Sequence, residues 1–525
     1  MKKWLILIIL LVNFSYIQFI FTNSIYYTNQ SIDIKIKKSS SPINFMLNDD
    51  IMGITQYSLF MVSENESFWN NDSSSFPHIA IDKDHNIHVV WEDNTNVWGT
   101  DSEIMYSEYI HTLNKWTNPI IISDNSSNWN DGNSLYPDIA VDELGSVYIV
   151  WEDWSIGPWS YDQGDSEIMY RKFTPDNGWS DVIIISDNES KWNTGASKHP
   201  SIAVDGDGIV SVVWEEYTAG SWGTDSEVFY RRSLDGINWG DFMVISDNSS
   251  HWNNGNSNYP FIVADKTGVL HVVWEDGTDG LWGSDSEIFY AFFDKNLEWH
   301  DPILVSDNLT NWNSGISMNP KLAVDFNSNV YFVWEDKTAG IWGTDSEIML
   351  RCYYKNNSWS NFQIISDNSS RWNNDTSALP SISIYNNNIF IAWVDYTDGT
   401  WGNDTEIMFT WYNRTDWSSV YIISEVPGII NNNTSTQPDI AIDNSGYVYI
   451  TWRDIINQLG GSDTEIFVIM PIIEENPHID IDNHGPIILT IFSIISYPVS
   501  IIIMLYVQKM SKNRIKINNR IKLKL

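Results

Sequence analysis

The sequence predicts an all-β fold: a seven-bladed β-propeller of four-stranded blades, closed by an N-terminal strand and followed by a C-terminal transmembrane helix. Three observations support this prediction. A unit of about 60 residues recurs seven times, each unit holds four short strand patterns, and a long uncharged segment lies near the C-terminus.

The repeat is marked by an apolar alternating run that ends in tryptophan and acidic residues. Its tryptophans are Trp91, Trp151, Trp214, Trp274, Trp334, Trp393 and Trp452. They are separated by 60, 63, 60, 60, 59 and 59 residues, and each is followed by an Asp-Ser/Thr-Glu-Ile/Val element. A fixed period of this length is typical of repeated supersecondary units.

Within one unit, short apolar runs alternate with turn residues. In the fourth unit these runs are 261–264, 270–274, 286–292 and 299–305, and Asp265 and Gly268 lie in the turn between the first two. Asp and Gly favour turn conformations, and no helical periodicity interrupts the pattern. Four antiparallel strands repeated around a ring are typical of a β-propeller, which leaves only short edges unpaired.

The first and last units indicate how the ring closes. Residues 57–63 carry a fourth-strand pattern before any first strand, and the seventh unit lacks a fourth strand of its own. We therefore expect the N-terminal strand to complete the last blade, which removes an open edge. An open solenoid of the same repeats is the competing interpretation, and it leaves the N-terminal strand unexplained.

The two ends of the chain carry targeting patterns. Two lysines precede an apolar run in 1–24, which predicts a signal peptide or signal anchor, and 25–55 reads as a flexible lead. The propeller is expected over 56–472 and a linker over 473–485. Residues 486–507 are uncharged and long enough to span a bilayer, and the tail 508–525 is basic without acids. By the positive-inside rule the tail is cytoplasmic, so the propeller is predicted to be extracellular on a single-pass cell-membrane protein.

The charge and the cysteine content exclude several classes of protein. The chain has 68 acidic and 29 basic residues, a formal net charge of −39, and one cysteine. A strongly acidic chain is a poor nucleic-acid ligand, because phosphate contacts require clustered Lys and Arg. A single cysteine excludes an intramolecular disulfide framework. The histidines are scattered, and His78, His85 and His88 are expected on turns and strand surfaces.

One hairpin resembles a known family. The residues Ser233, Asp235, Gly236 and Trp239 are similar to the Asp-box of sialidases, and degenerate versions occur in other units across 56–472. The resemblance implies a propeller in which the Asp-box braces a hairpin away from the active site. It also implies, for a sialidase, three arginines that grip a carboxylate, a tyrosine nucleophile supported by a glutamate, and an acid/base aspartate.

The arginines decide between two functional hypotheses. Most arginines of the propeller fall near third-strand ends, and only Arg371 and Arg453 fall near the rim where propellers usually bind ligands. Two arginines cannot form a triad. The favoured hypothesis is therefore a recognition or scaffolding module for extracellular protein or glycan, and the alternative is an exo-acting, sialidase-like glycoside hydrolase.

Aromatic and acidic residues recur in the loops of this rim. The loop of the second blade is the most irregular. The candidates for ligand contact are Trp98, Trp154, Trp159, Tyr161, Arg371 and Arg453. The rim carboxylates suit a hard cation such as calcium, the one cofactor for which the sequence supplies a reason. The candidate ligands are Glu92, Asp93, Asp101, Glu103, Glu275, Asp276, Asp285 and Glu287. The alternative for both sets is structural: buried tryptophan and bonded carboxylates that hold the blades together.

Glycosylation sequons support an external location. Six asparagines occupy the same position of six inter-blade loops, each followed by x-Ser or x-Thr: Asn65, Asn125, Asn188, Asn248, Asn308 and Asn368. Glycosylation would require these loops to lie outside the cell. Loops rich in Asn and Ser also create such triplets by composition, so both explanations stay open.

Overall fold

The computed structural model divides the chain into two compact units, Met1–Ile472 and Ile473–Leu525, and all described residues lie in the first. These residues are 43–51, 54–63, 70, 72–95, 101–123, 130–157, 165–186, 193–247, 252–296, 298–307, 313–340, 342–367, 373–399, 402–425, 434–455 and 463–471. No helix among them is long and apolar enough to cross a bilayer. The predicted segments 1–24, 473–485, 486–507 and 508–525 lie outside the described residues.

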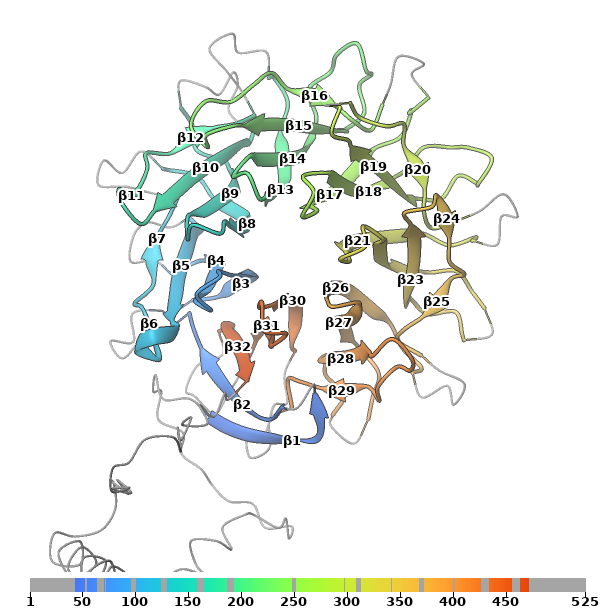
Figure 1. The fold of residues 1–525 in the computed structure, drawn as a ribbon. Coiled ribbons are helices and arrows are strands. Elements are labelled where there is room, and N and C mark those ends of the chain that lie inside the picture. The colour runs from blue at the N-terminus through green and yellow to red at the C-terminus, as the bar shows by residue number, and fades with distance from the viewer. Residues whose placement is uncertain are drawn as a thin grey trace, which may run out of the picture. The chain divides into compact units, whose positions relative to one another are not determined.

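Seven antiparallel sheets stand in a ring around a central channel (Figure 1). Blade 1 contains β3 (Ser74–Ile81), β4 (Ile87–Asp93), β5 (Glu103–Ile110), the 3-10 turn η1 (His111–Leu113), β6 (Lys115–Trp116) and β7 (Ile120–Ile121). Blade 2 contains β8 (Ser134–Val141), β9 (Val147–Asp153), β10 (Glu167–Thr174), β11 (Gly178–Trp179) and β12 (Ile183–Ile184). Blade 3 contains β13 (Ser197–Val204), β14 (Val210–Glu216), β15 (Glu227–Ser233) and β16 (Met243–Val244).

The remaining blades repeat this plan. Blade 4 contains β17 (Ser257–Ala264), β18 (Leu270–Asp276), β19 (Glu287–Phe293) and β20 (Ile303–Leu304). Blade 5 contains β21 (Ser317–Val324), β22 (Val330–Asp336), β23 (Glu347–Tyr354), β24 (Ser358–Trp359) and β25 (Gln363–Ile364). Blade 6 contains β26 (Ser377–Tyr385), β27 (Asn388–Asp395), β28 (Glu406–Tyr412) and β29 (Tyr421–Ile422). Blade 7 contains β30 (Thr436–Ile442), β31 (Val448–Asp454) and β32 (Glu465–Pro471), joined by β2 (Ile54–Met61) and β1 (Ile43–Ile51).

The core lies between neighbouring blades. Every residue of β14 is buried, because each central strand has a blade packed on both of its faces. This explains why the second strand of each unit reads as a continuous apolar run rather than an alternating one. In one such layer, Val213 and Tyr230 of blade 3 pack with Trp274 and Phe289 of blade 4.

The repeated tryptophan anchors each of these layers. Trp274 has no exposed surface, and its indole N–H donates to Asp276 Oδ2 at 2.9 Å. A buried indole needs such a partner for its one donor. The acid two residues after each tryptophan is therefore part of the core.

The N-terminal strand closes the ring, which confirms the prediction for residues 57–63. β2 pairs antiparallel with β32, with Leu59 opposite Ile469 (blue beside red in Figure 1). The side chains of Tyr57 and Leu59 are buried in one cluster with Trp452. The last blade thus takes its fourth strand from the opposite end of the propeller sequence.

Two boundaries differ from the sequence prediction. Residues 43–51, expected in a flexible lead, form β1 and pair with β2 from Ile43 opposite Leu59 to Ile51 opposite Ile54. The fourth strand expected over 299–305 is reduced to Ile303–Leu304, with a separate bridge between Phe293 and Trp299.

Candidate functional site

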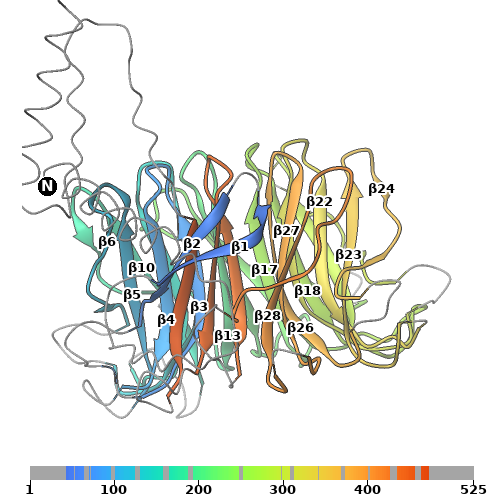
Figure 2. The ribbon, with the colours of Figure 1, turned by 90° about the horizontal axis from the view of Figure 1, so that it is seen from below.

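The first strand of every blade is the innermost one (Figure 1), and residues of all seven first strands line a central channel. Seen from the edge of the ring, the long strands of the blades stand side by side (Figure 2). Near its start each of these strands carries an X-Pro pair. The seven prolines are Pro77, Pro137, Pro200, Pro260, Pro320, Pro380 and Pro438. All seven pairs line one cavity of about 200 Å³.

The residue before each proline has a left-handed backbone. These residues are Phe76, Tyr136, His199, Tyr259, Asn319, Leu379 and Gln437, with φ between 46° and 58°. Each lies in the two-residue gap where the pairing of the first and second strands shifts register. Left-handed backbone is uncommon for residues other than glycine and a marked outlier for bulky ones. Strain of this kind clusters at binding sites, where the surrounding structure holds it in place.

The cavity opens on the rim where ligand contact was predicted. The chain enters each first strand from an inter-blade loop, so the strand start lies on the same rim as the loops between second and third strands. The bulges therefore turn seven side chains toward the mouth of the channel on that rim.

Four of the seven side chains form an arc of touching rings, which we call the aromatic arc: Phe76, Tyr136, His199 and Tyr259. Ring centroids are 4.6 Å apart between Phe76 and Tyr136, 4.5 Å between Tyr136 and His199, and 4.4 Å between His199 and Tyr259. Tyr259 is 45% exposed. Blades 5 to 7 complete the mouth with two amides and one leucine, so it has an aromatic side and an amide side.

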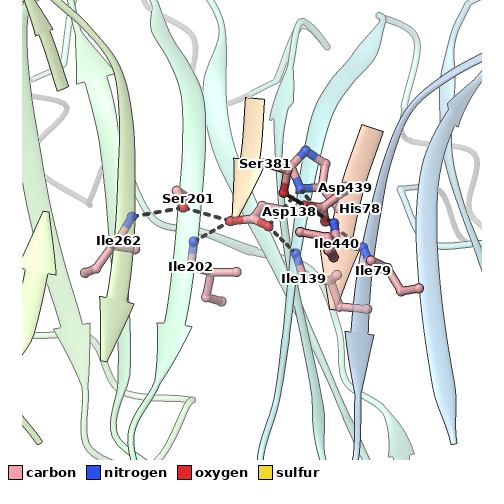
Figure 3. A network of polar contacts seen from close by, with 10 residues as sticks. All are labelled: His78, Ile79, Asp138, Ile139, Ser201, Ile202, Ile262, Ser381, Asp439 and Ile440. Atoms are coloured by element: carbon pink, nitrogen blue, oxygen red, sulfur yellow. Dashed lines mark hydrogen bonds and ion pairs between the residues drawn. The ribbon is translucent and has the colours of Figure 1, made fainter. Parts of the chain in front are cut away.

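Deeper in the channel, two aspartates flank one histidine (Figure 3). His78 Nδ1 lies 3.4 Å from Asp138 Oδ1 and 3.6 Å from Asp439 Oδ2. Asp138 Oδ2 accepts from Ser201 Oγ at 2.8 Å and from the Ile202 amide at 2.9 Å. Burial works to raise the pKa of Asp138, but the hydrogen bond and charge of His78, with further help from Lys321, hold it below its ordinary value. His78 lies on β3 with its side chain 24% exposed in the channel, and His85 lies in the turn after β3, as expected. The expectation of a surface position was wrong for His88, which is 3% exposed within β4.

The second aspartate is bonded in the same way. Asp439 Oδ2 accepts from the Ile79 amide at 3.0 Å, and Asp439 Oδ1 accepts from Ser381 Oγ at 2.9 Å. These side chains satisfy amides on the inner edge of neighbouring first strands, which have no further strand to pair with. Both carboxylates are therefore acceptors engaged with several donors.

A belt of five glutamates lies behind the mouth, one residue after the buried tryptophan of blades 1 to 5: Glu92, Glu152, Glu215, Glu275 and Glu335. We call it the glutamate belt. The His199 amide donates to Glu152 Oε2 at 3.3 Å, and His199 Nδ1 lies 2.8 Å from Glu215 Oε2. Asn319 Nδ2 donates to Glu335 Oε2 at 3.1 Å. Glutamates of two successive blades therefore hold one strained mouth residue between them.

Burial raises the pKa of several belt carboxyls. It raises the pKa of Glu92 to about 7, with a further upward contribution from the charge of Glu152. It raises the pKa of Glu275 to about 7, with Glu215 and Glu335 as repelling neighbours. Blade 7 has Arg453 at the equivalent position, and there Gln437 Oε1 accepts from the Phe76 amide at 2.9 Å.

The predicted rim residues fall in different places. Trp154 is half-buried, and its indole donates to Glu152 Oε1 at 2.7 Å, outside the cavity lining. Arg453 is half-buried near Glu92. Burial lowers the pKa of Arg453, and the negative charge of Glu92 partly counteracts this. Trp98, Trp159, Tyr161 and Arg371 lie outside the described residues, as do the six sequon asparagines Asn65, Asn125, Asn188, Asn248, Asn308 and Asn368.

The eight predicted calcium ligands separate into three environments. Glu92 and Glu275 belong to the glutamate belt. Asp93 and Asp276 bond the buried tryptophan and nearby amides, as in the 2.9 Å contacts from the Thr95 and Thr278 amides. Glu103 and Glu287 accept from serine hydroxyls, and Asp101 and Asp285 are half-buried beside them in sequence. No three His, Cys, Asp or Glu side chains in the described part are arranged to hold a metal ion, and the calcium hypothesis stays a prediction.

Several loop tryptophans and third-strand arginines hold the blades together. Trp282 is half-buried and donates to the Thr278 carbonyl at 3.0 Å, and Trp222 and Trp342 repeat this contact. Arg231 Nη1 donates to the Ile185 carbonyl of the preceding blade at 2.6 Å. Arg171 and Arg351 make the equivalent contacts. These arginines are therefore engaged with backbone carbonyls between blades.

The Asp-box-like hairpin is braced by its own side chains. Asp235 Oδ1 accepts from the amides of Ile237 and Asn238 at 2.8 and 2.7 Å, and Ser233 Oγ donates to the Asn238 carbonyl at 2.7 Å. This hairpin joins the third and fourth strands, on the face opposite to the channel mouth. It has a structural role.

No family model matches the chain, and no curated protein matches it. Solved structures of similar fold include an ulvan lyase bound to -[GlcA(1-4)Rha3S]-, at 10% identity over 76% of this chain and 94% of that chain, with a TM-score of 0.50. Others are the NanB sialidase of Streptococcus pneumoniae, at 12% identity over 79% and 70% with a TM-score of 0.40, and a Penicillium chrysogenum α-L-arabinanase, at 16% over 64% and 92% with a TM-score of 0.41. At these identities the likeness shows the propeller fold alone.

Proposed function

We propose that this propeller is a glycan-recognition module and that the mouth of its central channel is the binding site. The observation that carries the proposal is the set of seven left-handed residues around one cavity, of which Phe76, Tyr136, His199 and Tyr259 form the aromatic arc. Aromatic rings offer flat faces to the C–H face of a sugar, while the amides of Asn319 and Gln437 offer donors and acceptors to its hydroxyls.

The size of the cavity favours a single sugar ring. Drug-sized ligands usually occupy pockets of about 300–1,000 Å³, and this cavity holds about 200 Å³. A terminal or side-chain sugar therefore fits the proposal better than a long stretch of polymer. One solved propeller of similar fold is named as an ulvan lyase of a polysaccharide lyase family.

The bonding of the channel carboxylates favours binding over hydrolysis. A glycoside hydrolase needs one carboxyl that holds a proton and a second that is free to act as base or nucleophile. Asp138 and Asp439 each accept several hydrogen bonds, and the pKa of Asp138 is held below its ordinary value. Exo-acting glycoside hydrolysis is therefore the second candidate.

Removing a ring of the aromatic arc is expected to weaken glycan binding by tenfold or more. The full chain would be screened against a glycan panel, and affinities of the best ligands measured by calorimetry for the wild type, Tyr136→Ala and Tyr259→Ala. Phe326→Ala is the matched control, because Phe326 is 70% exposed in the turn between β21 and β22, on the opposite face. We expect the control to bind as the wild type does.

Three results would contradict this proposal. Equal binding by wild type and both tyrosine variants would place the site elsewhere. Turnover of aryl glycosides that is lost in Asp439→Asn would instead assign the channel to hydrolysis. If no glycan of the panel binds and the chain instead captures one extracellular protein tightly, the partner is a protein rather than a glycan.

We also propose that the propeller is displayed outside the cell and tethered through residues 486–507. The support is in the sequence: an uncharged segment of bilayer length, followed by a basic tail without acids. Sequons in the inter-blade loops agree with an external position.

Protease added to intact cells is expected to digest the propeller and to spare an epitope tag placed after Leu525. The tag should become sensitive only after the cells are permeabilised. Digestion of the tag in intact cells, with a protected propeller, would reverse the proposed orientation.

A further inference from the structure

The channel mouth already stabilises positive charge on aromatic faces. Within the cavity, Lys321 Nζ lies 4.0 Å from the ring centroid of Phe261. At the rim, Lys198 Nζ lies 5.2 Å from the Tyr217 ring and 5.6 Å from the Trp154 ring. An ammonium group within about 6 Å of such a ring is attracted by the negative charge density on the ring face.

The surroundings of the aromatic arc are acidic. The five carboxyls of the glutamate belt lie behind it, and Asp138 and Asp439 lie below it in the channel. Permanent cations close to these carboxyls are Lys198, Lys321, Lys337 and Arg453. The chain as a whole carries −39. Low-dielectric walls lined by charges of one sign concentrate the field inside a cavity and raise the local concentration of counter-ions.

One belt carboxyl has an unused acceptor. Glu92 is 7% exposed, and its Oε2 has no hydrogen-bond partner within the described residues. The Tyr136 amide bonds to this side chain, so Glu92 stands directly behind a ring of the arc. Burial is the main cause of the raised pKa of Glu92 and of Glu275. Neighbouring belt glutamates add to the rise, and the charge of Arg453 opposes it at Glu92.

We propose that the sugar recognised at the channel mouth carries a protonated amino group, so that the ligand is an amino sugar whose ammonium lies against the aromatic arc, in the field of the cavity carboxylates Asp138 and Asp439 and of the glutamate belt behind them. This inference rests on the proposed glycan-recognition function and names its ligand class. A bound ammonium group is stabilised both by the ring faces and by the carboxylates around the arc. An acetylated amine keeps the shape of the sugar but carries no charge.

The matched ligands for the test are the tetramers of glucosamine and of N-acetylglucosamine. At pH 6 and low salt, where the glucosamine amines are protonated, we expect calorimetry on the full chain to show the glucosamine tetramer binding at least tenfold more tightly. This preference should shrink as salt rises, because added ions screen the attraction.

Three variants separate a charge effect from simple contact. Tyr136→Phe keeps the ring and should retain the preference for the charged tetramer, whereas Tyr136→Leu keeps an apolar side chain without a ring and should lose most of it. Asp138→Asn removes a cavity carboxylate that is charged at pH 6, because its pKa is held below the ordinary value. It should reduce the affinity for the charged tetramer and leave that for the acetylated one nearly unchanged. Circular dichroism confirms that each variant is folded.

The outcomes distinguish this inference from the function on which it rests. Equal affinity for the two tetramers, or binding only of neutral or acidic glycans from the panel, overturns the amino-sugar assignment and leaves glycan recognition standing. Absence of binding to every glycan overturns both. Tight binding of a tetralysine peptide, with no binding of the glucosamine tetramer, would assign the cation to a protein side chain and also overturn the inference.

Discussion

Leu59→Ala is expected to lower the free energy of unfolding by about 2–5 kcal/mol, the usual cost of truncating a buried leucine. Leu59 is 3% exposed on β2, lies opposite Ile469 of β32, and packs in one cluster with Trp452 and Phe467. Because β2 is the strand that closes the ring, loss of its apolar contact also weakens the junction between the two ends of the propeller sequence.

The matched control is Leu113→Ala, since Leu113 is 67% exposed in η1. Urea unfolding followed by tryptophan fluorescence measures both variants. We expect the control to stay within about 0.5 kcal/mol of the wild type, as surface substitutions usually do. Equal midpoints for Leu59→Ala and the wild type would show that the ring does not depend on this strand.

The free energy of unfolding is expected to fall as pH rises from about 5 to 9. Burial raises the pKa of Glu227 to about 9 and the pKa of Glu287, Glu347 and Glu406 to about 8, with nearby aspartates and, for Glu406, Glu425 adding to the rise. In each of them Oε2 accepts from a serine hydroxyl, while Oε1 has no hydrogen-bond partner in the described part of the chain.

The direction follows from the two pKa values of each group. A carboxyl whose pKa is higher in the folded protein than in the unfolded chain, where it is near 4.5, favours folding fully below 4.5. That contribution is lost as pH rises through the folded value of 8 to 9. Each such glutamate changes the free energy of unfolding by up to about 1.4 kcal/mol per pH unit in this window.

Glu227→Gln isolates one of these groups. The stability of this variant relative to the wild type should rise by up to about 4 kcal/mol between pH 5 and pH 8, because the variant has no proton to retain. The exposed Glu143→Gln is the control and should show a pH-independent difference. Urea titrations at the two pH values measure both, and a constant difference for Glu227→Gln would show that Glu227 ionises in the folded protein as readily as in the unfolded chain.

The blade count and the closing strand could be predicted because both depend on features that repeat. The buried tryptophan must recur once per blade, so its spacing counts the blades directly. The missing fourth strand of the seventh unit and the extra strand pattern at 57–63 are complementary, so each indicated the other. β1 was missed because Asn48, Asp49 and Asp50 give its sequence the polarity of a loop.

The channel mouth was missed for the opposite reason. Its seven residues differ from blade to blade, and they sit inside strands where alternation alone predicts an ordinary pleat. A signal was nevertheless present, because a proline stands at the same point of every first strand and Phe76, Tyr136, His199 and Tyr259 precede four of them. Proline removes a backbone donor and restricts the residue before it, so its recurrence inside a strand marks an irregularity.

The sequence-predicted rim residues were chosen from the loops, where tryptophan and acids recur. Trp154 proved to be bonded to Glu152 beside the mouth rather than in it. Recurrence indicated residues that every blade needs for packing. Residues that meet a ligand at one shared opening have no reason to be alike.

The residues that recur in every blade to support the fold are different from the residues at the channel mouth, which vary from blade to blade. This difference has a consequence for protein engineering. The prolines and bulges hold the backbone at seven places around one opening, and of the side chains at those places only Leu379 is among the described apolar residues of the layers between the blades. Exchanging them in combination would give a library of receptors on one unchanged frame, in which selectivity is altered without rebuilding the scaffold.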